Sequence, residues 1–121
     1  MRQYEIWRAK LPGAAGDRPV LLLTRDEAYN YLHKFIVAEV TTRIRGIPVE
    51  VPLSSVEGLP HKCVANCDNL RTVARSWLVR RLGALSKRRE REIKRAIGYA
   101  FDWEELIQAG TEFGSGRAGR I

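Results

Sequence analysis

The spacing of the apolar residues changes near residue 85. Before that point, apolar residues form short runs or alternate with polar ones, a pattern typical of β-strands. The strands expected from this pattern cover residues 4–10, 19–24, 35–41, 49–53, 62–67, 71–73 and 79–85. Residues 12–17 predict a turn-rich loop, and residues 26–32 predict a short helical segment.

A helical pattern follows the last expected strand. Ser86 is a good N-cap, because its hydroxyl can accept a hydrogen bond from a free backbone N–H of the first turn. Beyond it, apolar residues recur at helical spacing, at Ile93, Ala96, Ile97, Ala100 and Phe101. Several strands followed by one amphipathic helix predict an α+β domain, in which the helix closes one end of a small, strongly bent antiparallel sheet or barrel.

Length and composition fit one globular domain. The chain has 121 residues, of which 45% are hydrophobic and 29% are charged, so disorder is excluded as its main state. No run approaches the ~18 apolar residues of a membrane span, and no apolar signal region follows the N-terminus. We therefore expect a cytoplasmic protein without membrane association, whose two cysteines, Cys63 and Cys67, are reduced thiols.

The charge is strongly positive. Lys and Arg total 21 against 14 Asp and Glu, which gives a net charge of +7. Clustered cations on a small domain form a footprint for a polyanion such as nucleic acid. A merely solvated basic surface is the alternative, and charge alone does not decide between the two.

The C-terminal residues differ from the rest of the chain. Residues 110–121 (GTEFGSGRAGRI) are rich in Gly and poor in apolar side chains. They predict a disordered tail or a remnant of the expression vector. The expected boundaries are therefore 1–109 for the folded domain and 110–121 for the tail.

Several kinds of site are excluded by missing motifs. The chain has no glycine-rich phosphate loop and no nucleophile elbow. His61, Cys63 and Cys67 are the only metal-like cluster, and they lack the second ligand pair that a zinc site takes from elsewhere in a chain. We predict no metal site and no cofactor.

Polar residues gather instead at the ends of the predicted strands. Arg18 directly precedes Pro19 and a buried strand, Thr41 ends another strand, and Asp68 follows the strand that carries Cys67. A rigid sheet can hold such side chains in fixed positions. An arginine, a hydroxyl and a carboxylate suit a phosphodiester site. The alternative is a solvated arginine, a β-forming threonine and a turn aspartate.

Five segments of the chain, the first of them in two pieces, resemble in order the MazF/PemK family of toxin endoribonucleases. The opening strands match at Glu5–Trp7 and Arg18–Leu23, and the next strand matches at Ile36–Thr42. The match continues through Gly46–Leu53, through Asp68–Val73, which resembles the family's D-Q-x-R-T segment, and through Arg81–Ser86. Together these segments span about residues 1–102.

The resemblance implies a fold and an activity. The fold is a small, twisted SH3-like β-barrel with a C-terminal amphipathic helix, acting as a homodimer. The activity is metal-independent, sequence-selective cleavage of single-stranded RNA, either messenger or transfer RNA. The family's catalytic arginine and threonine fall on Arg18 and Thr41, and a carboxylate used by some members falls on Asp68. An acidic antitoxin segment is the implied protein partner.

Further residues are expected to contact RNA. Arg43, Arg45 and Lys62 lie in predicted loops that face the basic groove, and Asn66 and Asn69 flank Asp68. Near the final helix, more apolar surface is present than one small barrel needs, which favours a two-fold interface there. The residues that supply it are Trp77, Leu78, Val79, Leu82 and Leu85.

The chain departs from the family pattern in two places. The loop before Arg18 is shorter than usual and lacks the family's glutamate, and Asn66 stands where members that use the Asp68 carboxylate often have arginine. The acid and base of the reaction and the RNA target therefore stay open. Two other functions stay open as well: a non-catalytic nucleic-acid-binding barrel and a gyrase-poisoning toxin of the same fold.

Overall fold

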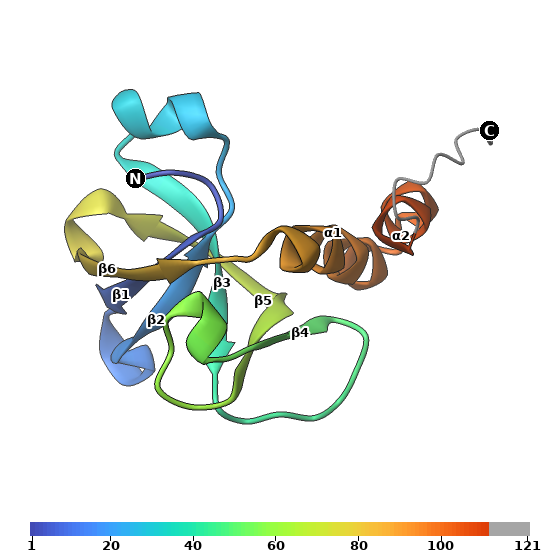
Figure 1. The fold of residues 1–121 in the computed structure, drawn as a ribbon. Coiled ribbons are helices and arrows are strands. Elements are labelled where there is room, and N and C mark those ends of the chain that lie inside the picture. Colours follow the sequence, from blue (N-terminus) through green and yellow to red (C-terminus); the bar gives the residue numbers. More distant parts are fainter. Residues whose placement is uncertain (112–121) are drawn as a thin grey trace.

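The computed structural model describes residues 1–111 and forms one six-stranded antiparallel sheet, in the order β4-β5-β3-β2-β1-β6 (Figure 1). Along the chain, the strands are β1 (Glu5–Lys10), β2 (Asp17–Leu22), β3 (Lys34–Thr41), β4 (Glu50–Leu53), β5 (Cys63–Ala74) and β6 (Leu78–Ala84). Two helices, α1 (Lys87–Phe101) and α2 (Glu104–Thr111), follow. The connections contain 3-10 helices at Gly13–Ala15, Asp26–Asn30, Ser55–Glu57 and Arg75–Trp77.

Both faces of the central strand β3 carry buried side chains, which explains why its apolar run is nearly continuous, although Ile36 is exposed. Phe35 and Val37 pack into one apolar cluster, and Ala38 and Val40 pack into a second cluster on the opposite face. The second cluster also contains Ile93 of α1. The helix therefore packs against one face of the curled sheet, whereas the sequence predicted that it closes one end.

β5 contains a bulge at its centre. Ala38 of β3 pairs with Leu70, whereas the next residue, Glu39, pairs with Asn66. The intervening segment, 67–69, has no opposite residue on β3. Such an insertion bends a strand and redirects its side chains. It also explains why the sequence predicted separate strands at 62–67 and 71–73 where the structure has one.

The half-barrel closes where the 3-10 helix Ser55–Glu57 meets β6. A Cβ atom at Gly83 would overlap the backbone carbonyl of Glu57, and a Cβ at Gly58 would overlap that of Leu82. Gly58 also has a φ of 92°, a conformation that favours glycine. The two backbones touch at this seam, where only glycine leaves room.

The start of α1 is tied to the same seam. Ser86 is its N-cap, as predicted, although the Ser86 side chain makes no capping hydrogen bond. Arg89 Nε lies 3.7 Å from Oε2 of Glu57, whose side chain is only 2% exposed, and Arg89 Nη1 donates to Glu92 at 2.7 Å. This ion pair connects the helix to the 3-10 helix that closes the barrel.

The predicted fold class is confirmed, and the apolar surface expected near the final helix is partly buried within the chain. Leu85 is buried, and Trp77, Leu78 and Leu82 pack against the two clusters. Val79 is the exposed member of that group, at 48%. The predicted tail lies outside the described residues, apart from Gly110 and Thr111, which end α2.

Candidate functional site

Side chains from three neighbouring strands and one loop surround a hollow of about 180 Å³, which we call the arginine hollow. β2, β3 and β5 are adjacent in the sheet, so residues far apart in the sequence meet there. The lining residues are Arg18, Glu39, Thr41, Arg43, Arg45, Asn66 and Asn69. The structure thus brings together six of the residues predicted from the sequence and adds Glu39.

Arg18 is held at the start of β2. A residue before proline is restricted to extended backbone, which suits its pairing with Ala9 of β1. Its guanidinium has two anchors: Nε donates to the carbonyl of Ala15 at 3.1 Å, and Nη1 donates to Oε1 of Glu39 at 3.3 Å. The side chain remains 33% exposed. An oriented guanidinium is therefore accessible to an anion.

Glu39 bridges two arginines. Its Oε1 accepts from Arg18, and its Oε2 accepts from Nη1 of Arg71 on β5 at 3.1 Å. The Glu39 side chain is 18% exposed. Sequence reasoning missed both Glu39 and Arg71. The available signal was a lone carboxylate inside the apolar run of β3, since a charged residue at such a position is normally paired.

Thr41 lies two residues after Glu39, on the same face of β3. Its Oγ1 accepts the backbone N–H of Arg43 at 3.1 Å. A hydroxyl that accepts one hydrogen bond still has its own hydrogen to donate. Thr41 therefore both shapes the start of the β3–β4 loop and presents a donor to the arginine hollow.

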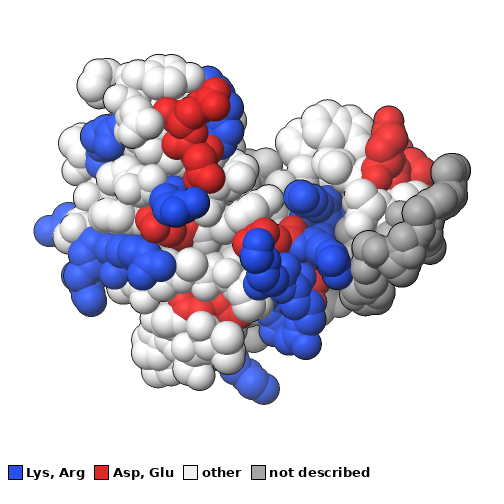
Figure 2. Space-filling view, turned by 45° about the horizontal axis from the view of Figure 1, so that its top comes forward, with Lys and Arg blue, Asp and Glu red and all other residues white. Residues whose placement is uncertain are grey.

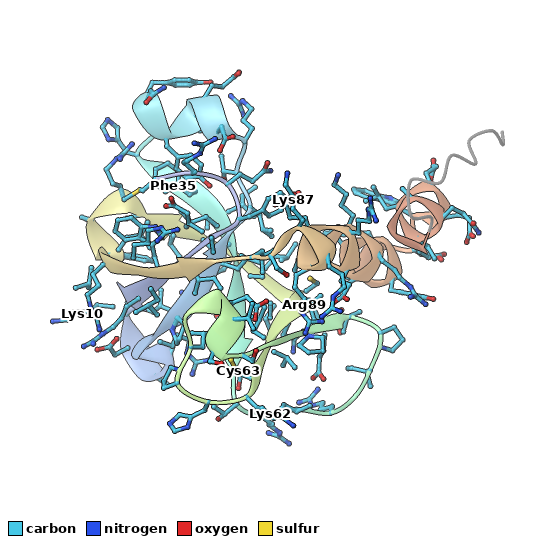
Figure 3. The ribbon with its side chains drawn as sticks, in the orientation of Figure 1. Lys10, Phe35, Lys62, Cys63, Lys87 and Arg89 are labelled. Carbon is cyan, nitrogen blue, oxygen red and sulfur yellow. The ribbon has the colours of Figure 1, made fainter. Side chains whose placement is uncertain are left out.

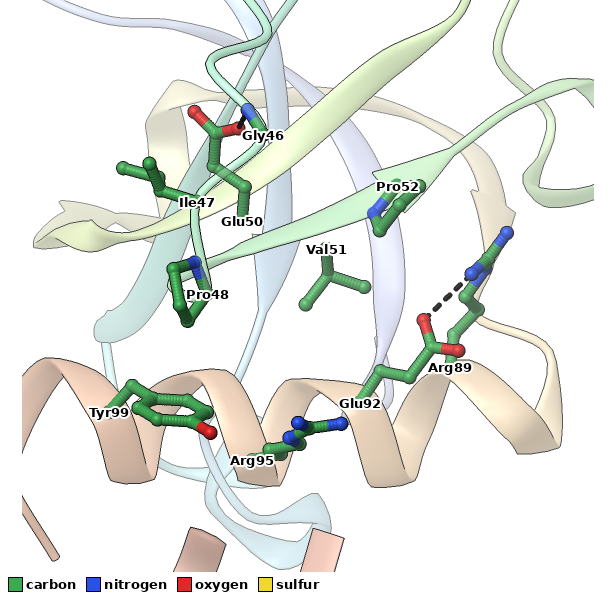
Figure 4. Close-up of a pocket in the computed structure, with 10 residues that line it drawn as sticks. All are labelled: Gly46, Ile47, Pro48, Glu50, Val51, Pro52, Arg89, Glu92, Arg95 and Tyr99. Carbon is green, nitrogen blue, oxygen red and sulfur yellow. Dashed lines mark hydrogen bonds and ion pairs between the residues drawn. The ribbon is translucent and has the colours of Figure 1, made fainter. Parts of the chain in front are cut away.

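Glu50 fixes the loop that carries Arg43 and Arg45. Its buried carboxylate accepts the backbone N–H groups of Arg45 and Gly46, both at 2.9 Å. Figure 4 shows the bond from Gly46. The same view shows a larger hollow, of about 480 Å³, between this loop and α1. None of the predicted site residues lines that larger hollow.

Two predicted residues lie outside the arginine hollow. Asp68 sits in the β5 bulge, where its side chain is exposed and its backbone N–H donates to Oδ1 of Asn66 at 2.9 Å. Lys62 is exposed just before β5, next to the buried Cys63 (Figure 3), and lines a different hollow. The bulge therefore turns Asn69 toward the site and leaves Asp68 outside the set of lining residues.

The electrostatics around the site favour anions. The site has one carboxylate, Glu39, and four arginines: Arg18, Arg43, Arg45 and Arg71. A second group of Lys and Arg follows α1 (Figure 2), with exposed side chains at Lys87, Arg88, Arg91, Lys94 and Arg95. A surface of this kind attracts a phosphate backbone.

The described residues offer neither a cluster of metal ligands nor an ionised thiol. Within residues 1–111, no three His, Cys, Asp or Glu side chains come together in an arrangement that could hold a metal ion. Burial raises the pKa of the Cys67 thiol to about 12 and also raises the pKa of the Cys63 thiol. Both cysteines are therefore protonated at neutral pH.

Comparison with known proteins identifies the family. The family described as PemK-like, MazF-like toxin of type II toxin-antitoxin system matches residues 2–101. The chain belongs to this family. Endoribonuclease MazF3 of Mycobacterium tuberculosis is 40% identical to this MazF-like toxin over 90 residues, which are 74% of the chain and 87% of that relative.

Solved structures agree with the family assignment. Mycobacterium tuberculosis toxin MazF-mt6 matches this MazF-like toxin with a TM-score of 0.76 at 40% identity, over 81% of the chain and 96% of that toxin. An endoribonuclease from a mycobacterial species, solved with its cognate antitoxin, matches with a TM-score of 0.75 at 21% identity, over 85% and 96% of the two chains. At this lower identity the match shows the fold alone.

The family predicted from five short segments is thereby confirmed, and so is its barrel. Neither helix within residues 1–111 has the length and apolar character needed to cross a membrane. The MazF-like toxin presents its arginine hollow on the sheet rather than on the helices.

Proposed function

We propose that this MazF-like toxin is an endoribonuclease that cuts single-stranded RNA at the arginine hollow, by a reaction that needs no metal. The observation that carries the proposal is the guanidinium of Arg18, anchored twice and still accessible, with Thr41 in the same hollow. Membership of a toxin family with endoribonuclease relatives supports the choice of RNA as the substrate.

The proposed reaction uses a nucleophile that RNA itself supplies. The 2′-oxygen of a ribose attacks the adjacent phosphorus and forms a new P–O bond, while the bond from phosphorus to the 5′-oxygen breaks. The 2′-hydroxyl loses its proton, and the departing 5′-oxygen gains one. The products are a 2′,3′-cyclic phosphate and a 5′-hydroxyl. Negative charge rises on the non-bridging oxygens as the attack proceeds.

Arg18 is the proposed stabiliser of that charge. Guanidinium is permanently charged and presents N–H donors in a fork that fits two phosphate oxygens. Donors placed before the reaction stabilise a transition state most, because they need no reorganisation. The contacts of Arg18 with Ala15 and Glu39 provide that placement. Thr41 is proposed to donate a hydrogen bond to the phosphate or to orient the 2′-hydroxyl.

Glu39 and Arg71 extend the proposed site. Both oxygens of Glu39 already accept hydrogen bonds from guanidinium groups, so we assign it as a positioning residue for Arg18 and Arg71. Asp68 remains a proposed participant in proton transfer or positioning, as the family resemblance implies. Its exposed place in the β5 bulge would require RNA to reach over the rim of the hollow.

Binding partners follow from the charge and from the relatives. Arg43, Arg45, Lys62, Asn66 and Asn69 are the proposed RNA contacts, and a homodimer would join two such surfaces. An acidic antitoxin segment is the proposed inhibitor, because it would compete with RNA for the same arginines. One relative of the same fold is described in complex with its cognate antitoxin.

Cleavage of single-stranded RNA in the presence of EDTA tests the proposal. We expect cutting by the wild-type protein and products that end in a 2′,3′-cyclic phosphate. Arg18→Ala should lose about 10²-fold or more in rate, by comparison with the loss of one oxyanion donor. Arg25→Ala, which removes an exposed arginine paired with Glu27, is the matched control and should retain full activity. RNA binding without cleavage would favour the non-catalytic alternative.

A further inference from the structure

Thr41 belongs to the walls of two hollows. One is the arginine hollow, and the other is a pocket of about 220 Å³, which we call the apolar pocket. It lies among Pro19, Val40, Thr41, Leu59, His61 and Cys63. Pro19 directly follows Arg18 in β2, so the two side chains lie on opposite faces of the strand, and the two hollows meet beside Thr41.

The two hollows differ sharply in character. The arginine hollow has a mostly polar lining, whereas almost all of the accessible lining of the apolar pocket is apolar. Leu59 and Cys63 are buried beneath it, and His61 is exposed at its rim. A phosphate has no partner in such a pocket, but a ring that is apolar on its faces and polar on its edges fits it well.

The chemistry of the lining favours binding over reaction. Burial raises the pKa of the Cys63 thiol, which keeps it protonated and a poor nucleophile. His61 and Cys63 have no third metal-ligating side chain beside them within residues 1–111. Two of the three residues that looked metal-like in the sequence, His61 and Cys63, therefore serve as walls of a pocket.

The size of the pocket limits its occupant. Its volume of about 220 Å³ equals that of about seven water molecules at ~30 Å³ each. This volume is below the range of about 300–1,000 Å³ that is typical of pockets for drug-sized ligands. One planar ring system fits this space. Single-stranded RNA is recognised through unstacked bases that lie against side chains such as histidine.

We propose that the apolar pocket binds one nucleobase flanking the scissile phosphate, with the base stacked against His61. The proposal rests on the proposed function, since the phosphate in the arginine hollow brings the neighbouring base to Thr41. A base held there fixes the adjacent ribose relative to Arg18. The pocket would therefore contribute to the choice of cleavage sequence as well as to affinity.

The test couples a change in the protein to a change in the RNA. An RNA oligonucleotide carrying a mapped cleavage site is made in three forms: unmodified, abasic on the 5′ side of the scissile phosphate, and abasic on its 3′ side. Wild type, His61→Ala and His61→Phe are compared by kcat/KM. His33→Ala is the matched control, because His33 is exposed at the opposite end of β3 from Thr41.

On unmodified RNA, His61→Ala should lower kcat/KM by about 5- to 150-fold, the range for loss of one base–aromatic stack, and His61→Phe should restore most of that loss. At one of the two positions, removal of the base should lower wild-type activity by a similar factor and should have little further effect in His61→Ala. His33→Ala should behave as wild type on all three RNAs.

Two results would overturn the inference and separate it from the proposed function. If the loss caused by His61→Ala and the loss caused by removal of the base multiply at both flanking positions, no base occupies the apolar pocket, although the proposed cleavage reaction is unaffected. If His61→Ala cleaves unmodified RNA as fast as wild type, His61 does not contact the substrate. Absence of any wild-type cleavage would instead refute the proposed function on which the pocket depends.

Discussion

Replacing Glu39 by glutamine should slow RNA cleavage about tenfold. The substitution keeps the shape of the side chain and removes the charge that bridges Arg18 and Arg71, at 3.3 Å and 3.1 Å. Arg18 would keep its second anchor, the carbonyl of Ala15, so its guanidinium would lose part of its orientation and remain in the arginine hollow.

The size of the effect follows from the contacts. A hydrogen bond to a charged group contributes about 1.5–3 kcal/mol, and solvent reduces that value here because Arg18 and Arg71 are 33% and 29% exposed. A loss near the lower end, about 1.4 kcal/mol of transition-state stabilisation, corresponds to one factor of ten in rate. Glu39→Gln should thus lie between wild type and Arg18→Ala.

Salt dependence provides an independent measurement. Without Glu39, one more guanidinium becomes free to contact a phosphate, and each contact on a single strand adds about 0.7 to the slope of log affinity against log salt. The slope for Glu39→Gln should therefore be steeper than that of wild type by about 0.7. RNA affinity at low salt should rise while kcat falls.

Glu5→Gln is the matched control. Glu5 is also a strand carboxylate, 14% exposed and 3.3 Å from Arg81, but it sits on β1 away from the position that pairs with Arg18. It should leave cleavage unchanged. An unaltered rate and salt slope in Glu39→Gln would refute the positioning role. A loss as large as that of Arg18→Ala, with the acidic limb of the pH profile gone, would show that Glu39 is a proton acceptor instead.

Three further predictions concern RNA affinity and stability. The Arg43→Gln/Arg45→Gln double variant should lower the slope of log RNA affinity against log salt by about 1.4, because two phosphate contacts are lost. Fluorescence anisotropy measures this slope. Gly83→Ala should destabilise the fold by about 3 kcal/mol or more in urea unfolding, because the methyl group meets backbone at the seam; an unchanged midpoint would contradict the seam. Cys67 has a folded pKa of about 12 against an ordinary value of 9.0, so the unfolded chain loses this proton first. The free energy of unfolding should keep the full contribution of Cys67 below pH 9 and lose about 1.4 kcal/mol per pH unit between pH 9 and about 12, and Cys67→Ala should show a shallower decline.

The sequence predicted the elements better than their pairing. Continuous apolar runs placed β2 and β3 to within two residues, because both strands carry buried side chains on both faces, and helical spacing placed α1. Periodicity did not reveal that β5 continues through the 67–69 bulge. The bulge exists because of pairing with β3, which is a property of the sheet and not of the segment itself.

The same limit applied to the site. Arg18 and Thr41 were found because their positions match a family motif. Glu39 and Arg71 belong to the site because they form an ion pair with each other. Residues that are 32 positions apart form one ion pair only after β3 and β5 align, and no local pattern encodes that register. Asp68 shows the reverse: its motif position was clear, but the bulge leaves it outside the lining of the hollow.

The pairing of the first strand with the last has a consequence for synthesis on the ribosome. Ile6 of β1 pairs with Gly83 of β6, so the first strand emerges long before its outer partner exists. A nascent chain that ends before residue 78 already contains Arg18, Glu39 and Arg71 but lacks β6 and the helix that covers the core. Closing so long a loop is entropically unfavourable and slow. The order of translation therefore delays the complete sheet until β6 has been made.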